Sequence, residues 1–223
     1  MRTRISTSIG LTALAVASVA AVTAAPAGAT TGSSARTVTK AHVDSLNNSG
    51  AHGSATVVVK NGKLNVRARV HGLTPNNAPH AQHIHFGEQA RHECPTFRDD
   101  TNNDFRLNTA EGLPAYGPIR VSLTTRGDTS PASGLAVDRM PVARDRGHKH
   151  HRMNAINYSR YGIRTQADVL AGIKAGEAVY VIHGIDYNGN GRYDFNGAGR
   201  SELDPSLPAE ATDPAACGVL EVQ

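Results

Sequence analysis

Residues 56–73 read TVVVKNGKLNVRARVHGL, and this stretch decides the fold class. Asn61-Gly62 is a dipeptide that type I′ hairpin turns favour, because both residues tolerate a positive φ. After the turn, Leu64, Val66 and Val70 alternate with polar residues, a period of two typical of a half-buried strand. The stretch therefore predicts an antiparallel hairpin with one face against a core.

The remaining pattern extends this hairpin into an all-β domain. Several short strands separated by long loops are typical of a β-sandwich or barrel. One short helix is predicted from Thr165 to Lys174, capped by Thr165 and stopped near Gly176. The further expected strands cover residues 80–86, 119–125, part of 134–143, 177–185 and 217–222.

The first 29 residues have the pattern of a secretory signal peptide. Arg2 and Arg4 precede an apolar run at 9–22, and Ala27-Gly28-Ala29 forms a small-residue cleavage site. The sequence thus predicts a secreted protein with residues 1–29 removed. Residues 30–50, rich in Ser, Thr, Asn and Gly, are expected to be a flexible leader. Residues 51–223 are expected to form one domain without a membrane span.

Charge and cysteine content narrow the class further. The chain has 23 Lys and Arg against 19 Asp and Glu, and the signal peptide would remove two of these arginines. Such a weak positive charge argues against nucleic acid as a partner. The two cysteines, Cys94 and Cys217, predict a disulfide in an exported protein, with two free buried thiols as the alternative. The sequence indicates no oligomeric state.

Histidines are concentrated in HAQHIHFGE, residues 80–88. On a strand, His83 and His85 project to the same side and could bind one metal ion. They could equally be solvated residues on the wet face of a sheet. His183 ends the apolar run AVYVIHGID, where a polar strand terminator is the alternative to a third ligand.

The order of these elements resembles the copper/zinc superoxide dismutase family. The shared features are a Gly72-Leu73-Thr74 turn, the H-x-x-H-x-H strand, a cysteine nine residues after His85, and a late ACGV at 216–219. The resemblance implies an eight-stranded Greek-key β-barrel. It also implies that His83, His85 and His183 are copper ligands, that His80 is a structural histidine beside them, and that Cys94 pairs with Cys217.

Two departures from that family predict weak or absent dismutase activity. No histidine lies between Cys94 and His148, so the bridging histidine and the zinc subloop are missing. Pro214 stands where the family has the arginine that guides superoxide, and Arg192 or Arg200 could substitute for it. An active copper-only superoxide dismutase is one alternative. Zinc plus water would also suit three histidines, although no carboxylate is placed as a general base.

A second resemblance is to chordin-type CHRD domains. These also have an AHIH-like strand and a late strand similar to AGEAVYVIH, residues 175–183. Because such domains are not established enzymes, this resemblance implies a structural or binding module.

Residues 100–111, DTNNDFRLNTAE, resemble an EF-hand calcium loop. Oxygen-bearing side chains at alternate positions can wrap one calcium ion, and a glutamate at position 12 closes the loop. Phe105 stands at position 6, where the sharp turn prefers glycine. A polar surface loop is the alternative. The candidate ligands are Asp100, Asn102, Asp104, Arg106, Asn108 and Glu111.

Residues 186–194, DYNGNGRYD, follow the same logic, with an Asn/Gly-rich turn as the alternative. Position 12 is Gly197, so a closing carboxylate would have to fold back from Glu202 or Asp204. A last cluster, HKHH, contains His148, His150 and His151 and could form another metal site or a solvated loop. The candidate calcium ligands of the second loop are Asp186, Asn188, Asn190 and Asp194.

Overall fold

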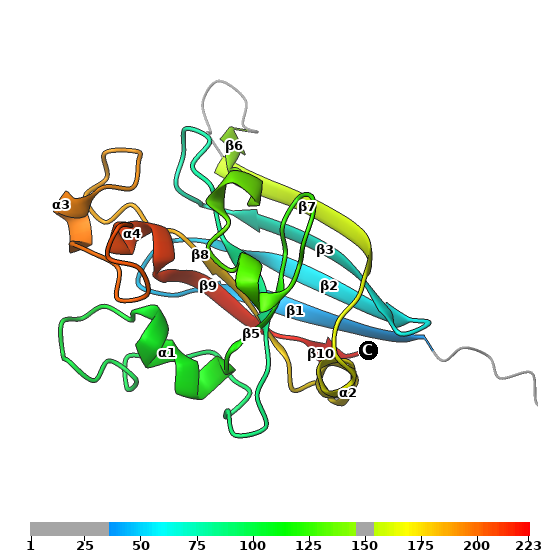
Figure 1. Cartoon of the computed structure of the whole chain (residues 1–223). Coiled ribbons are helices and arrows are strands. Elements are labelled where there is room, and N and C mark those ends of the chain that lie inside the picture. Colours follow the sequence, from blue (N-terminus) through cyan, green and yellow to red (C-terminus); the bar gives the residue numbers. More distant parts are fainter. Residues whose placement is uncertain (1–35, 146–153) are drawn as a thin grey trace, which may run out of the picture. The chain divides into compact units, whose positions relative to one another are not determined.

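The computed structural model describes residues 36–145 and 154–223. Ten antiparallel strands form one curled sheet in the order β5-β4-β8-β9-β1-β2-β3-β7-β6, with β10 beside β1 (Figure 1). The predicted all-β fold is confirmed. The strands are β1 Thr37–Ser45, β2 His52–Lys60, β3 Lys63–His71, β4 Gln82–His85, β5 Ile119–Ser122, β6 Arg144–Asp145, β7 Asn154–Ile163, β8 Val179–His183, β9 Pro214–Val219 and β10 Glu221–Val222.

The described chain has more helices than the one predicted. They are α1 Thr109–Tyr116, α2 Ala167–Ala175, α3 Phe195–Ala198 and α4 Ala209–Thr212. The predicted helix is α2, which ends at Gly176 with a φ of 80°. Its N-cap is Gln166 rather than Thr165, and it has no side-chain cap. The strand expected within 134–143 is wrong: residues 137–139 form a 3-10 turn, and Val142 makes only an isolated bridge with Pro79.

The hairpin that anchors the fold is β2–β3. Asn61 and Gly62 have φ values of 53° and 67°, which is the backbone that the type I′ prediction requires. Leu64, Val66 and Val70 are fully buried, and their polar neighbours point away from the core. The same alternation in β1 and β2 makes the sheet's inner face the hydrophobic core.

The sequence predicted a flexible leader over residues 30–50, but residues 37–45 of this segment form β1. This strand lies inside the sheet, between β9 and β2, and also pairs with β10. Thr39, Ala41 and Val43 alternate inward and are buried. Their side chains are short, and their neighbours are mostly polar. The alternation of buried and exposed residues in this strand is therefore weak in the sequence.

The disulfide predicted from the sequence is present. Cys94 and Cys217 are bonded, with their Cα atoms 5.7 Å apart. The bond joins the segment after β4 to the middle of β9. No helix among the described residues is long and apolar enough to cross a membrane. The predicted signal peptide and the HKHH cluster at 148–151 lie outside the described residues.

Candidate metal centre

Strand register brings the three predicted histidines to one face of the sheet. β4 pairs antiparallel with β8, and His83 lies opposite Val181 while His85 lies opposite Val179. Opposite residues in a pair share a face, and so do residues two apart along a strand. His183, two residues beyond Val181, therefore joins His83 and His85. The other face of β4 carries Ile84 into the hydrophobic core.

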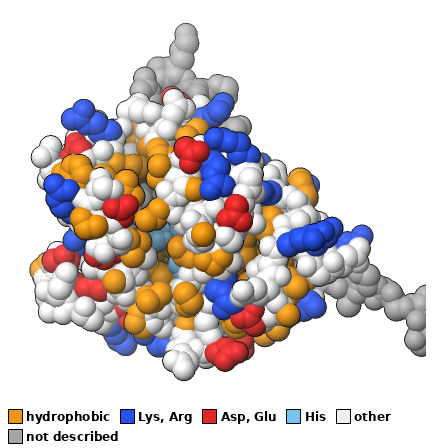
Figure 2. All heavy atoms as spheres, in the orientation of Figure 1, with side chains coloured by type: hydrophobic (Ala, Val, Ile, Leu, Met, Phe, Trp, Pro, Cys, Tyr) orange, Lys and Arg blue, Asp and Glu red, His pale blue; other side chains and the backbone are white. Residues whose placement is uncertain are grey.

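The three imidazoles are close enough to hold one ion. His83, His85 and His183 each offer one ring nitrogen, and these atoms all lie within 4.8 Å of one another. All three side chains are buried, with at most 3% of their surface exposed. On the molecular face in Figure 2, histidine atoms show only at the base of a hollow, between hydrophobic and uncharged side chains.

Backbone carbonyl groups fix one nitrogen of each ring. His83 Nε2 lies 3.0 Å from the Gly134 oxygen, and His85 Nδ1 lies 2.7 Å from the Gly117 oxygen. His183 Nδ1 lies 2.6 Å from the Thr212 oxygen. Because a carbonyl oxygen only accepts, each of these nitrogens carries the hydrogen.

The second nitrogen of each ring then has a lone pair. His83 Nδ1, His85 Nε2 and His183 Nε2 are buried, and none of them has a hydrogen-bond partner among the described residues. Three orphaned acceptors in one place would be costly unless something satisfies them. Imidazoles that bind metals are usually arranged in this way, with the remote N–H hydrogen-bonded to a carbonyl or carboxylate. The buried three-histidine group could therefore bind a metal ion.

Burial also sets the protonation state that a ligand needs. Desolvation lowers the pKa of His85 to about 3 and that of His183 to about 4. The pKa of His83 falls well below 6.5, through desolvation first and then through its neighbours His183 and His85. All three rings are thus neutral near pH 7, as metal coordination requires.

His80 lies beside this group but is fully engaged elsewhere. Its Nδ1 is 2.8 Å from the His183 oxygen, and its Nε2 is 3.2 Å from the Thr74 oxygen. The Tyr193 hydroxyl packs against the same ring. Its contacts tie the 72–75 loop to the end of β8, as a structural role would require.

The two arginines predicted as anion guides are held within their own loop. Arg192 Nε is 3.3 Å from Asp194 Oδ2, and its side chain is 74% exposed. Arg200 donates to the Pro205 oxygen and lies over the Phe195 ring. A different arginine, Arg106, reaches the residue after Thr212: its Nη1 lies 2.7 Å from Asp213 Oδ2.

The two oxygen-rich loops, 100–111 and 186–194, share one hydrogen-bond pattern. In the first, the Asp100 carboxylate accepts from the N–H groups of Asp104 and Phe105. In the second, the Asp186 carboxylate accepts from those of Asn190 and Gly191. The acceptors at positions 3 and 5 bind equivalent backbone N–H groups in both loops.

Position 6 has the same left-handed backbone in each loop. Phe105 adopts a φ of 61° and Gly191 a φ of 84°. The phenylalanine therefore makes the turn that the sequence assigned to glycine, at a cost of roughly 1–2 kcal/mol. Its side chain is 86% exposed.

A glutamate occupies the closing place in both loops. Glu111 accepts hydrogen bonds from the N–H groups of positions 2 and 9, Thr101 and Asn108. In the second loop, Glu210 of α4 accepts from Tyr187 and Asp194, which are again positions 2 and 9.

The closing residue expected for the second loop, Glu202 or Asp204, is therefore wrong. Glu202 accepts from the Thr109 N–H at the start of α1, and Asp204 caps Ser206. Gly197, at position 12, leaves the space that Glu210 fills, since a Cβ there would collide with Glu210 Oε1.

Helix α4 connects both loops to the histidine site. Glu210 closes the second loop, and the Thr212 oxygen holds His183 and also accepts from Thr109 Oγ1 of α1 at 2.7 Å. Asp213 follows, and Tyr187 donates to its Oδ2 at 3.0 Å.

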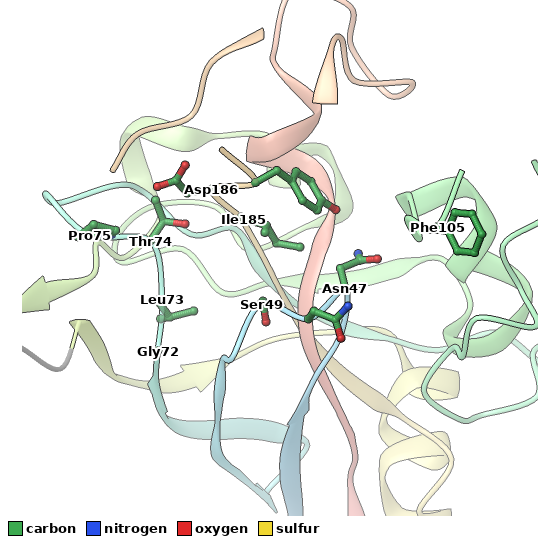
Figure 3. Close-up of a pocket in the computed structure, with 12 residues that line it drawn as sticks. Asn47, Ser49, Gly72, Leu73, Thr74, Pro75, Phe105, Ile185 and Asp186 are labelled. Atoms are coloured by element: carbon green, nitrogen blue, oxygen red, sulfur yellow. The ribbon is translucent and has the colours of Figure 1, made fainter. Parts of the chain in front are cut away.

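A hollow of about 460 Å³ lies between the 47–49 turn, the 72–75 loop and residues 184–187, which follow His183 (Figure 3). None of the three histidines lines it.

Sequence reasoning missed the groups that hold the site together. The acceptors from Gly117, Gly134 and Thr212 are backbone oxygens, which leave no mark in the sequence. Glu210 is far along the chain from the loop it closes. The one available signal was the absence of a carboxylate at Gly197.

No protein-family model matches the chain, and no curated protein matches it in sequence.

Proposed function

We propose that this protein is a secreted copper-binding protein of the superoxide dismutase type, with weak or no dismutase activity. The observation that supports this most strongly is the arrangement of His83, His85 and His183. Each ring has one nitrogen held by a backbone carbonyl and one buried nitrogen without a partner. Secretion is proposed from the signal-peptide pattern of residues 1–29.

The donor set favours copper over a hard cation. Three neutral imidazoles without a carboxylate suit both copper oxidation states, and copper(II) binds nitrogen ligands more tightly than zinc does. Bound copper would supply one-electron chemistry, accepting an electron from one superoxide and passing it to the next. The chain's own contribution is to hold the lone pairs of the three imidazoles close together. Backbone carbonyl groups, and not water, bind the other nitrogen of each ring.

The surroundings of the site argue for slow turnover. The position that the family resemblance gives to the guiding arginine is Pro214, which is buried in β9. Arg106, the arginine tied to Asp213 nearby, is neutralised by that carboxylate and by Asp104. Steering of an anion needs an excess of positive charge at the approach to the metal. We therefore expect the protein to bind the metal firmly but to dismutate superoxide slowly or not at all.

We also propose that calcium stabilises the two oxygen-rich loops. The support is the hydrogen-bond pattern repeated at positions 1, 2, 3, 5 and 9 of both loops, with Glu111 and Glu210 in the same closing role. Each carboxylate oxygen that accepts one N–H keeps a second lone pair, which a calcium ion could use. The role would be structural, since α4 carries the loop contacts toward His183.

The first experiment is metal analysis of the secreted protein purified without chelators. We expect about one copper per chain, and electron paramagnetic resonance of the copper(II) form should show nitrogen ligands. The double variant His83→Ala/His85→Ala should lose that copper. A matched control, His42→Ala/His52→Ala, removes two exposed strand histidines and should retain it. Equal copper loss in the control, or no transition metal in the wild-type protein, would refute the histidine site.

A superoxide assay on the copper-loaded protein separates the alternatives. Rates near the diffusion limit would favour an active copper-only superoxide dismutase. Slow or undetectable turnover with retained copper supports the binding role. Calcium without any transition metal would instead favour a CHRD-like structural module, and zinc alone would reassign the metal.

A further inference from the structure

The outer face of the sheet carries a row of cations without acidic partners. Arg36, Lys40, Lys60, Arg67 and Arg69 all point away from the core on β1, β2, β3 or the residue before them. None of the five has a carboxylate within ion-pair distance in the described parts of the chain. Six arginines elsewhere, at 91, 106, 120, 126, 139 and 192, do have one, whereas Arg98, Arg160, Arg164 and Arg200 have none among the described residues.

This face is hollowed rather than flat. One hollow of about 690 Å³ is lined by Arg36, Lys40, Lys60 and Arg67 together with Tyr161 of β7. A second, of about 380 Å³, shares Arg67 and Tyr161 and continues to Arg69. Within residues 36–145 and 154–223, no aspartate or glutamate lines either hollow. We call the two together the basic groove.

The cations are kept at a cost to the fold. Lys60 and Lys63 are directly opposite each other at the end of the β2–β3 hairpin, where like charges destabilise a sheet. Figure 2 shows Lys and Arg side chains gathered at this hairpin end of the sheet. The nearest acidic neighbour by register is Glu221, opposite Lys40 on β10, and it forms no ion pair there. An excess of positive charge at one hollow points to an anionic ligand.

Neutral groups in the groove indicate what kind of anion fits. Thr56, Asn65, Asn157 and Ser159 line it and offer hydroxyl and amide groups between the cations. Tyr161 is 58% exposed and lies under the Arg67 guanidinium, 5.6 Å from the carbon of that group to the ring centre. Cations, hydroxyl-bonding groups and one flat ring together match a sugar that carries carboxylate or sulfate groups.

We propose that the basic groove binds an acidic polysaccharide. Neighbouring strands are about 4.8 Å apart, so Lys40 on β1 and Arg67 on β3 are separated by roughly 10 Å across the sheet, comparable to one disaccharide. A membrane surface fits less well, because Val38 and Val58 are half-buried and Tyr161 is the only exposed large apolar side chain among the described residues that line the groove. Single-stranded nucleic acid would need several stacking rings, and the groove has one.

The test measures binding of the full chain to a heparin-derived decasaccharide as salt is varied. We expect saturable binding, and Lys60→Gln/Arg67→Gln should weaken it and lower the slope of log Kd against log salt by about two. Dextran, which is neutral, should not bind. The control Arg98→Gln/Arg126→Gln changes the same charge outside the groove and should bind like wild type.

Several results would overturn the proposal. These are no saturable binding of the decasaccharide, equal weakening in the control variant, or tighter binding to an oligothymidylate or to phosphatidylglycerol vesicles. Far-ultraviolet circular dichroism and thermal melting of each variant show whether the fold is kept. A Tyr161→Leu variant tests the ring separately and should weaken decasaccharide binding without changing the salt slope. None of these outcomes depends on the metal site.

Discussion

Replacing Glu210 by glutamine tests whether this residue closes the second oxygen-rich loop. Glu210 is fully buried, and its two oxygens accept from Tyr187 N at 2.9 Å and from Asp194 N at 2.7 Å. Glutamine has the same shape but only one acceptor oxygen. Its NH₂ group must therefore face one of these N–H donors. Gly197 packs against the carboxylate, which leaves the side chain little room to turn away.

The expected loss follows from one unmade hydrogen bond to a charged group. Such a bond contributes roughly 1.5–3 kcal/mol, so we expect Glu210→Gln to lower the free energy of unfolding by about 2 kcal/mol. In a domain of this size each kcal/mol shifts Tm by about 2–4 °C, which gives a decrease of about 4–8 °C. Calcium should raise the Tm of the wild-type protein and do so less in the variant.

Thermal unfolding followed by circular dichroism, with calcium and with a chelator, measures both effects. Glu202→Gln is the matched control, because Glu202 accepts from the N-terminus of α1, at the end of the first oxygen-rich loop, and takes no part in the second. A Glu210→Gln protein that melts within about 1 °C of wild type, or a control with the same loss, would refute the closing role.

Four other outcomes follow from the structure. Lowering the pH from 6.5 to 4 should destabilise the metal-free protein, as measured by urea unfolding. Burial lowers the pKa of His80 to about 4, so between these pH values the unfolded chain binds more protons than the folded chain. The free energy of unfolding should therefore fall by about 1.4 kcal/mol per pH unit for each such histidine. Bound metal should move the loss to lower pH. Reducing the Cys94–Cys217 bond, which spans 123 residues, should cost roughly 4–5 kcal/mol of unfolding free energy. Phe105→Gly should raise Tm and tighten calcium binding in calorimetry, because it relieves a positive φ; a lower Tm would contradict that reading.

The sequence predicted those parts of the fold in which side-chain chemistry repeats along the chain. Asn61-Gly62 located the hairpin, and the spacing of His83 and His85 located the site. β1 was missed because Thr39 and Ala41 are too small to stand out from a polar segment. The anchoring carbonyl groups and Glu210 could not be found, because they depend on which segments meet in space.

Helix α4 is only four residues long, yet it serves two neighbours at once. Glu210 fastens the second loop, and the oxygen of Thr212 orients the His183 ring. Binding at either place would hold the same short segment still. By thermodynamic reciprocity, calcium bound in the loop would raise the metal affinity of the histidine site by the same factor as metal on His183 raises the calcium affinity of the loop. A protein moving from a calcium-poor to a calcium-rich medium would thereby gain affinity for its second metal without any change in that metal's ligands.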